Sequence, residues 1–110
     1  MRTLTAHTDI DRLFAGGRRV SHPALLVLGA ASPGGADAPG RVIFIAGKRL
    51  GNAVLRNRCK RVMRDAMRRA GGPFPGWDIA LIARGRTARA TPADLDMALG
   101  AAVAALEIDR

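Results

Sequence analysis

The side chains with the clearest chemical role lie in residues 48–69, and the chemistry that they suit is phosphate binding. This segment, KRLGNAVLRNRCKRVMRDAMRR, holds nine of the chain's 18 Lys and Arg residues and a single acid, Asp65. It therefore accounts for most of the formal net charge of +9. Arginine binds a phosphate through two parallel hydrogen bonds, whereas lysine contributes a compact charge. The composition favours a polyanion as the partner.

A helix over residues 52–70 would separate these basic side chains from an apolar stripe. The apolar side would carry Leu55, Cys59, Val62, Met63, Ala66 and Ala70. The opposite side would carry Asn57, Arg58, Lys60, Arg61, Arg64 and Arg68. Like charges three or four residues apart repel by about 0.2–0.5 kcal/mol per pair. A side that only faced solvent would mix its charges, so we interpret the basic side as a binding surface.

The sequence argues against a catalytic centre made by the protein itself. It offers no carboxylate cluster for two metal ions and no nucleophile beside a base. One cysteine and two scattered histidines give no set of metal ligands at usable spacing. Cys59 falls on the apolar side and is expected to be a small core residue. We expect neither a small-molecule substrate nor a metal site in the protein.

Two features argue against a membrane partner. No apolar run approaches the roughly 20 residues that a membrane span needs. A helix that lies on a membrane surface would carry large apolar side chains opposite its charges, whereas the apolar side here is small and mixed. We therefore expect a cytoplasmic protein that binds nucleic acid.

Three strands and two further helices are expected around the basic helix. A helix over residues 8–15 is expected to be capped by Thr8 and ended by Gly16 and Gly17. The expected strands are residues 18–29, 41–46 and 77–83. The turn-rich residues 31–40 should make a hairpin connection between the first two strands. Asn52 should cap the basic helix, and Thr91, Pro92 and Asp94 should begin the last one.

This order predicts a single domain over residues 1–110 with an α/β (α+β) fold. The elements run helix, strand, strand, helix, strand, helix along the chain. The basic helix would be the crossover of a βαβ unit, packed on a small mixed sheet in a two-layer sandwich.

The segment from Gly51 to Arg69 resembles the signature of the bacterial ribonuclease P protein subunit family. In that signature a basic turn and a glycine lead into a helix that contains Arg-Asn-Arg, a basic pair and a further arginine. The matching residues here are Arg56, Asn57, Arg58, Lys60, Arg61 and Arg64. The order of elements also matches over nearly the whole chain. The resemblance implies an α/β sandwich with a left-handed βαβ crossover, against the usual hand.

The resemblance also implies a function. Members of the family bind a catalytic RNA, which removes the 5′ leader from precursor transfer RNA with Mg²⁺ held mainly by the RNA; the protein alone is not a catalyst. The implied RNA contacts are Lys48, Arg49, Asn52, Arg56, Asn57, Arg58, Lys60, Arg61, Arg64 and Arg68. A cleft between the first helix and the sheet is the implied path of the leader, with Ile10, Phe14, Leu25, Leu28 and Arg84 along it.

The chain departs from the family pattern at two points. It has no tyrosine and only three phenylalanines, so base stacking, worth about 1–3 kcal/mol per base, is scarce. We expect leader affinity to depend more on apolar contact and charge. Gly47 stands where the family often has a hydroxyl residue, which weakens the case for a phosphate-binding role of that turn.

Two alternative functions remain open, as does the role of three loop arginines. The same basic helix would serve a structural RNA-binding module such as a ribosomal protein. A DNA-binding helix-turn-helix protein fits less well, because strands and glycine-rich turns flank the basic helix. The loop arginines Arg84, Arg86 and Arg89 are either solvated or in contact with a ligand.

Overall fold

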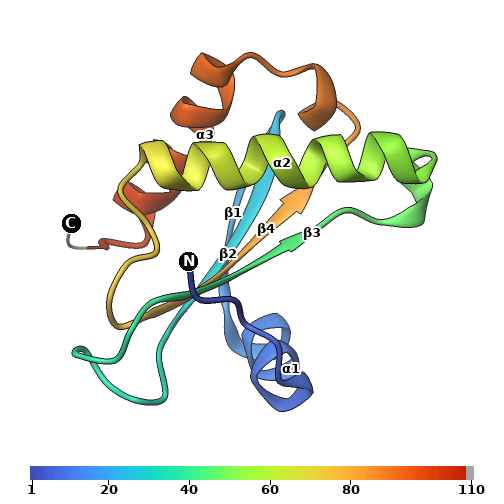
Figure 1. Cartoon of the computed structure of the whole chain (residues 1–110). Helices are drawn as coiled ribbons and strands as arrows, with labels where there is room; N and C mark the ends of the chain where they lie inside the picture. The colour runs from blue at the N-terminus through green and yellow to red at the C-terminus, as the bar shows by residue number, and fades with distance from the viewer. Residues whose placement is uncertain (109–110) are drawn as a thin grey trace.

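A four-stranded mixed sheet organises the protein, whose computed structural model describes residues 1–108 (Figure 1). The strands are β1 (Arg18–His22), β2 (Leu25–Ala31), β3 (Arg41–Ile45) and β4 (Trp77–Ala83), in the order β1-β2-β4-β3. The pairs β1–β2 and β2–β4 are antiparallel, and β3–β4 is parallel. The central strands β2 and β4 are the most apolar, as expected for strands that are covered on both faces.

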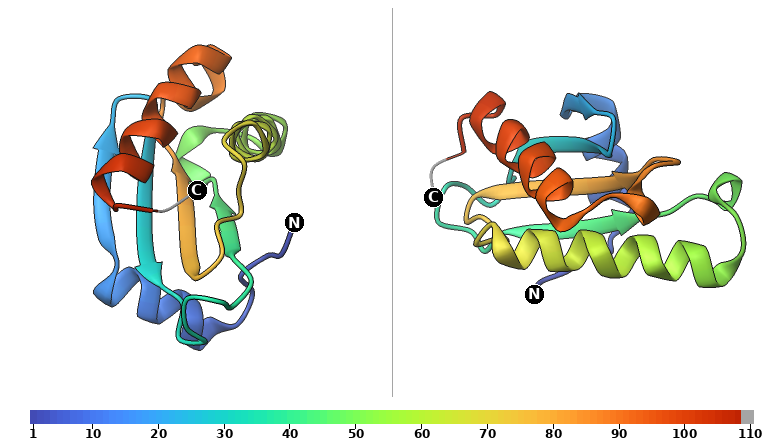
Figure 2. Two further views of the ribbon diagram at one scale, coloured as in Figure 1. Left: turned by 90° about the vertical axis from the view of Figure 1, so that its left-hand side faces the viewer. Right: turned by 90° about the horizontal axis from the view of Figure 1, so that it is seen from above.

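Helices cover both faces of this sheet. The helices are α1 (His7–Gly16), α2 (Ala53–Arg69) and α3 (Pro92–Ala105), with short 3₁₀ turns η1 (Lys48–Leu50) and η2 (Thr87–Arg89). Helices α2 and α3 pack on one face, and α1 packs on one end of the other (Figures 1 and 2). The main core lies between the sheet and α2 and α3, whereas a smaller cluster joins Leu4 and Leu13 to Leu28 and Ala80. The predicted α/β class is confirmed, and α1 adds a partial third layer.

The βαβ unit has the hand that the family resemblance implies. The chain leaves the end of β3, returns through α2 and enters β4, which runs parallel to β3. Seen from the side that α2 covers, with β3 and β4 pointing upward, β4 lies to the left of β3 (Figures 1 and 2). The crossover is therefore left-handed, in contrast to most parallel connections.

The strand predicted over residues 18–29 is wrong, because the chain folds back within it. Residues 22–25 form a tight turn between β1 and β2, and His22 Nδ1 accepts a hydrogen bond from the Ala24 amide at 3.1 Å. Pro23 sits in this turn, where its missing N–H removes no ladder bond. Residues 31–40 also do not make the expected hairpin, since β4 lies between β2 and β3. The element order therefore contains one more strand than predicted.

The helix starts follow local capping chemistry in two cases out of three. Asn52 Oδ1 accepts a hydrogen bond from the Leu55 amide at 2.9 Å, which confirms the predicted cap of α2. Thr91 and Asp94 form the predicted capping box of α3, with bonds of 3.0 and 3.1 Å. The Thr8 cap is wrong: α1 begins at His7 after Ala6, whose carbonyl already accepts from the Ile10 amide at 3.0 Å.

The capping box of α3 should make part of the protein's stability depend on pH. Hydrogen bonds from Thr91 lower the pKa of Asp94 below its ordinary value. A lowered carboxyl pKa stabilises the fold above the unfolded value, about pH 4, and this contribution is lost as pH falls through the folded value. The difference in Tm between the native protein and Asp94→Asn should therefore be present at pH 6 and shrink at about pH 3. A difference that stays constant over this range would show that the carboxylate charge contributes nothing.

Candidate nucleic-acid interface

The outward side of α2 exposes basic side chains to solvent. Cys59, Met63, Ala66 and Met67 are buried against the sheet and α3. Because they fix the rotation of the helix, the residues half a turn away point outward. Asn57, Arg61, Arg64 and Arg68 are exposed, as the sequence pattern predicts. We call these four residues the α2 outer side.

The exposed arginines of the α2 outer side are little neutralised by the protein. Within residues 1–108, Arg61 makes neither an ion pair nor a side-chain hydrogen bond. Arg68 lies 3.6 Å from Asp65, and both side chains are about half exposed. Such a pair contributes little in water, so both guanidinium groups are available to an external anion.

The side of α2 toward β3 carries Arg56, Lys60 and Arg64. The guanidinium of Arg64 lies over the Phe44 ring of β3, 5.1 Å from its centre. A cation over an aromatic face is held by about 0.5–1 kcal/mol at an exposed site. Arg56 and Lys60 are half-buried, and the Nε of Arg56 is buried with no partner among the described residues. Two of the ten predicted RNA contacts, Arg56 and Lys60, are therefore less exposed than the pattern alone indicates.

The side of α2 toward α3 carries two arginines that already have protein partners. Arg58 Nε donates to the Ala88 carbonyl in η2 at 3.0 Å. Arg69 Nε donates to Asp96 Oδ1 of α3 at 2.9 Å. Arg58 is one of the predicted RNA contacts. In the structure one of its donors holds η2, so Arg58 positions this turn in addition to any contact that its terminal nitrogens make.

Lys48 and Arg49 stand beside the N-terminus of α2. Both are exposed in η1, which leads through Gly51 into the Asn52 cap. Gly51 has φ of 135°, where a Cβ would also come within 2.8 Å of the Leu55 side chain, so glycine is required there. The first amides of a helix favour anions. Lys48 and Arg49 therefore extend the basic surface to the end of α2, while Oδ1 of Asn52 is occupied by capping.

The sheet face on the α1 side holds most of the residues predicted for a leader cleft. Leu28 is 2% exposed and packs with Leu13 of α1, and Ile10 is half-buried beside them. Phe14 is 48% exposed at the end of α1. Leu25 is a correction: it is fully buried in the core under α2 and α3. Residues three apart in a strand point to opposite faces, so Leu25 and Leu28 do not share one surface.

A row of residues that the sequence analysis missed continues this face beyond α1. The strand register aligns Ser21, Leu26, Ile82 and Ile45 across the four strands. Ile45 and Ile82 are half-buried. Arg84 follows on the same face, and it donates from Nη2 to Ser21 Oγ, while its Nε is buried with no partner within residues 1–108. The alternation in residues 41–46 and 77–83 was the signal that could have assigned these isoleucines to one face.

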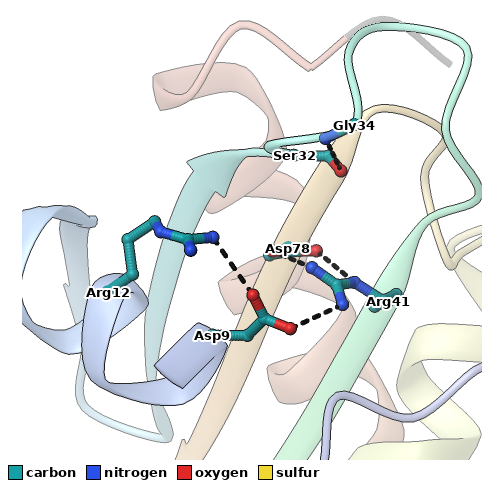
Figure 3. A network of polar contacts seen from close by, with 6 residues as sticks. All are labelled: Asp9, Arg12, Ser32, Gly34, Arg41 and Asp78. Atoms are coloured by element: carbon teal, nitrogen blue, oxygen red, sulfur yellow. Dashed lines mark hydrogen bonds and ion pairs between the residues drawn. The ribbon is translucent and has the colours of Figure 1, made fainter. Parts of the chain in front are cut away.

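An ion network holds α1 against the sheet (Figure 3). Arg41 of β3 donates to both carboxylate oxygens of Asp78, at 3.0 and 2.8 Å, and to Asp9 Oδ2 of α1 at 2.9 Å. Arg12 Nη1 binds the other oxygen of Asp9 at 3.1 Å. The hydrogen bond to Asp78 is the main cause that raises the pKa of Arg41. The Asp78 side chain is 5% exposed, so the hydrogen bonds from Arg41 offset the cost of its burial.

The described part of the chain shows no features of a metal site or of a membrane-spanning helix. No group of three His, Cys, Asp or Glu side chains in residues 1–108 is arranged to hold a metal ion. None of the helices described there has the length and apolar character of a membrane span. Burial raises the pKa of the Cys59 thiol, which keeps it protonated and unreactive.

Comparisons with known proteins identify the family. A family model described as Ribonuclease P matches residues 1–107. A ribonuclease P protein component from Gluconacetobacter diazotrophicus is 41% identical over 98 residues, which cover 84% of this chain and 83% of the relative. The chain belongs to the ribonuclease P protein family.

Other members of the ribonuclease P protein family match over shorter lengths. The protein component from Herpetosiphon aurantiacus is 44% identical over 82 residues, 74% of this chain and 64% of the relative. Two from Dehalococcoides mccartyi are 45% identical over 56 residues, so the chain spans about half of their length, 46%.

Solved structures of ribonuclease P proteins share the fold. One from Staphylococcus aureus superposes with a TM-score of 0.80 and 23% identity, covering 100% of this chain and 99% of that one. One from Thermotoga maritima gives a TM-score of 0.74 and 23% identity over 93% of this chain and 94% of that one. At this identity the likeness concerns the arrangement of the sheet and helices.

Proposed function

We propose that the protein is the RNA-binding subunit of ribonuclease P. In this proposal it binds a catalytic RNA through α2 and assists that RNA in removing the 5′ leader from precursor transfer RNA. The observation that carries the proposal is the α2 outer side, where exposed and little-neutralised arginines stand on a helix that buried side chains anchor. A rigid row of cations matches the spaced phosphates of a folded RNA at low cost in side-chain ordering.

Catalysis belongs to the RNA in this proposal. The protein supplies positive charge where two RNA molecules would otherwise repel each other, and part of that neutralisation would otherwise come from Mg²⁺. The chemistry that Mg²⁺ supplies is activation of water and stabilisation of the leaving oxygen, on ligands provided mainly by the RNA. The protein side chains bind and orient; none of them transfers a proton in the reaction.

Reconstitution tests this proposal directly. The protein would be mixed with a bacterial ribonuclease P RNA and a precursor transfer RNA at a Mg²⁺ concentration where the RNA alone is slow. We expect leader removal to accelerate when the protein is added and no cleavage by the protein alone. Cleavage without RNA, or no effect of the protein on the RNA, would contradict the proposal. Retention of ribosomal RNA instead, on purification from cells, would favour a ribosomal RNA-binding module.

The leader would follow the α1-side face, between Phe14 and the row that ends at Arg84. Half-buried Ile45 and Ile82 offer apolar contact, and Phe14 offers one exposed ring for stacking. Stacking of a base on an aromatic side chain is worth about 1–3 kcal/mol. Phe14→Ala should therefore weaken binding of a precursor with a leader by about 5-fold or more and leave mature transfer RNA unaffected.

Met97→Ala is the matched control for the Phe14 variant. Met97 is 68% exposed on α3, on the opposite face of the sheet. We expect this variant to bind precursor and mature transfer RNA like the native protein. If Phe14→Ala and Met97→Ala behave alike, the leader does not pass over α1.

A further inference from the structure

A pocket that contains two exposed arginines, Arg86 and Arg89, lies beside η2. It has a volume of about 370 Å³ and is formed where the β1–β2 turn, η2 and the start of α3 meet. We call it the turn pocket, and its polar lining consists of His22, Arg86, Arg89 and Asp94. None of these residues belongs to the α2 outer side or to the α1-side face.

The turn pocket carries net positive charge. Arg86 and Arg89 are exposed, and within residues 1–108 neither side chain makes a hydrogen bond or an ion pair. His22 Nδ1 is occupied by the Ala24 amide, so in the neutral ring Nε2 carries the proton and is a donor. Asp94 is the one acid of the lining, and its Oδ2 is committed to the Thr91 amide in the capping box. Two cationic side chains and a further donor thus face one internally bonded carboxylate.

Buried hydrogen bonds hold the walls of the turn pocket in place. Thr87 is fully buried, and its hydroxyl donates to the Ala24 carbonyl and accepts from the Arg84 amide, both at 2.7 Å. This one side chain joins η2 to the β1–β2 turn. Arg58 holds η2 from the other side through the Ala88 carbonyl. Arg86 and Arg89 therefore stand on a turn that is fixed before any ligand binds, which lowers the entropic cost of binding.

The turn pocket adjoins a depression beside the basic helix. Ala90 borders the turn pocket and also this second depression of about 180 Å³, which is lined by Arg58, Asp65 and Arg69 of α2. An RNA strand that lay along this depression would bring a neighbouring phosphate toward η2. A free phosphate ion would gain the same hydrogen bonds but not this second set of contacts.

We propose that the turn pocket binds a backbone phosphate of RNA through Arg86 and Arg89, as an anchor separate from the α2 outer side. Guanidinium groups suit this ligand because they donate two parallel hydrogen bonds to phosphate oxygens. Asp94 opposes the anion, so the pocket should discriminate against ligands that do not engage both arginines. This inference rests on the proposed function, because it assumes that RNA is the partner.

The test compares two double variants. The pocket variant carries Arg86→Gln and Arg89→Gln, and the charge-matched control carries Arg2→Gln and Arg12→Gln. Affinity for ribonuclease P RNA would be measured as a function of salt. We expect the slope of log K against log salt to become shallower by about 0.7–0.9 in the pocket variant, which is the loss of one phosphate contact. Because the replaced side chains are exposed, the Tm should not change. Equal slopes in the pocket variant and the control would overturn the proposal.

Titration with inorganic phosphate distinguishes the two sources of the ligand. The amide resonances of His22 and Asp94 would be followed by NMR in the native protein and in the pocket variant. A shallower salt slope in the variant supports the proposal whether or not phosphate alone moves these resonances. If phosphate moves these resonances but the salt slope of RNA binding is the same in the variant and the native protein, the proposal is overturned and the pocket is a site for free anions. A variant of the α2 outer side that also leaves the slope unchanged would instead mean that the proposed function has failed.

Discussion

The variant with Arg61→Ala and Arg68→Ala should lose about two phosphate contacts and keep its fold. Both side chains are exposed on the α2 outer side, and the only ion pair that they make in the described chain is the surface pair of Arg68 with Asp65. Each lost phosphate contact should make the slope of log K against log salt shallower by about 0.7–0.9. For the two arginines together we expect a change of about 1.5. The loss should be nearly uniform across RNA sequences, because phosphate contacts carry no base information.

Arg2→Ala with Arg12→Ala is the control for this prediction, since it removes the same charge from another part of the surface. A general effect of net charge would flatten the two slopes equally, and that result would contradict a localised contact on α2. Arg58 is deliberately kept, because its removal would also release η2 and confuse two effects. Circular dichroism melts of both variants would show whether the fold is retained.

Replacing Arg41 with methionine should lower the free energy of unfolding more than replacing any other partly exposed arginine of the protein. Arg41 is the partner of both Asp78 oxygens, and the Asp78 side chain is 5% exposed. Methionine would leave a buried carboxylate without its cation. Removing one member of a buried pair typically costs about 3–5 kcal/mol, and the 28% exposure of Arg41 places our expectation at the lower end. Urea unfolding followed by the Trp77 fluorescence would measure this change.

Arg12→Ala is the control for the Arg41 variant. Arg12 shares Asp9 with Arg41 but is 54% exposed, so its loss should cost below about 1 kcal/mol. A cost of Arg41→Met as small as that of Arg12→Ala would show that Asp78 is adequately solvated without its partner. Because Arg41 also ties Asp9 to the sheet, Arg41→Met should in addition loosen α1 and weaken leader binding.

The basic helix was predictable because its periodicity is local. The spacing of Cys59, Met63 and Ala66 determines which side of α2 is buried, and the capping residue Asn52 lies directly before the first turn. Both signals are contained within short stretches of chain, residues 59–66 for the spacing and residues 52–55 for the cap. The exposed positions of Arg61, Arg64 and Arg68 follow from the same period.

The features that the sequence analysis missed depend on residues that are distant in the chain. The β1–β2 turn lacks the glycine or asparagine that usually marks a hairpin, and a hydroxyl 63 residues away, on Thr87, holds its Ala24 carbonyl. Arg41 meets Asp78 across 37 residues. The Arg58 bond to Ala88 spans 30 residues. Nothing in the local pattern distinguishes these arginines from solvated ones.

The wrong placement of Leu25 came from the family resemblance and not from the strand pattern. Leu25 and Leu28 are three residues apart, so any strand that contains both places them on opposite faces. Once β2 is paired with β4, Leu25 lies opposite Ala83 in the main core and Leu26 lies opposite Ile82 on the α1 side. The left hand of the crossover was equally outside the reach of patterning, because both hands place the same residues in the same elements.

Directed cleavage of the RNA from a probe on α2 tests the central claim most directly. A hydroxyl-radical-generating iron chelate would be attached to a cysteine placed at Arg61, with Ala104→Cys as the comparison. Ala104 is exposed near the C-terminal end of α3, at the opposite end of this helix from the turn pocket. The native Cys59 is buried and should remain unlabelled. We predict strong cuts within one folded region of the ribonuclease P RNA from position 61 and none above background from position 104. Cuts from position 104 alone, or equal cuts from both, would contradict the assignment of α2 as the RNA-binding surface.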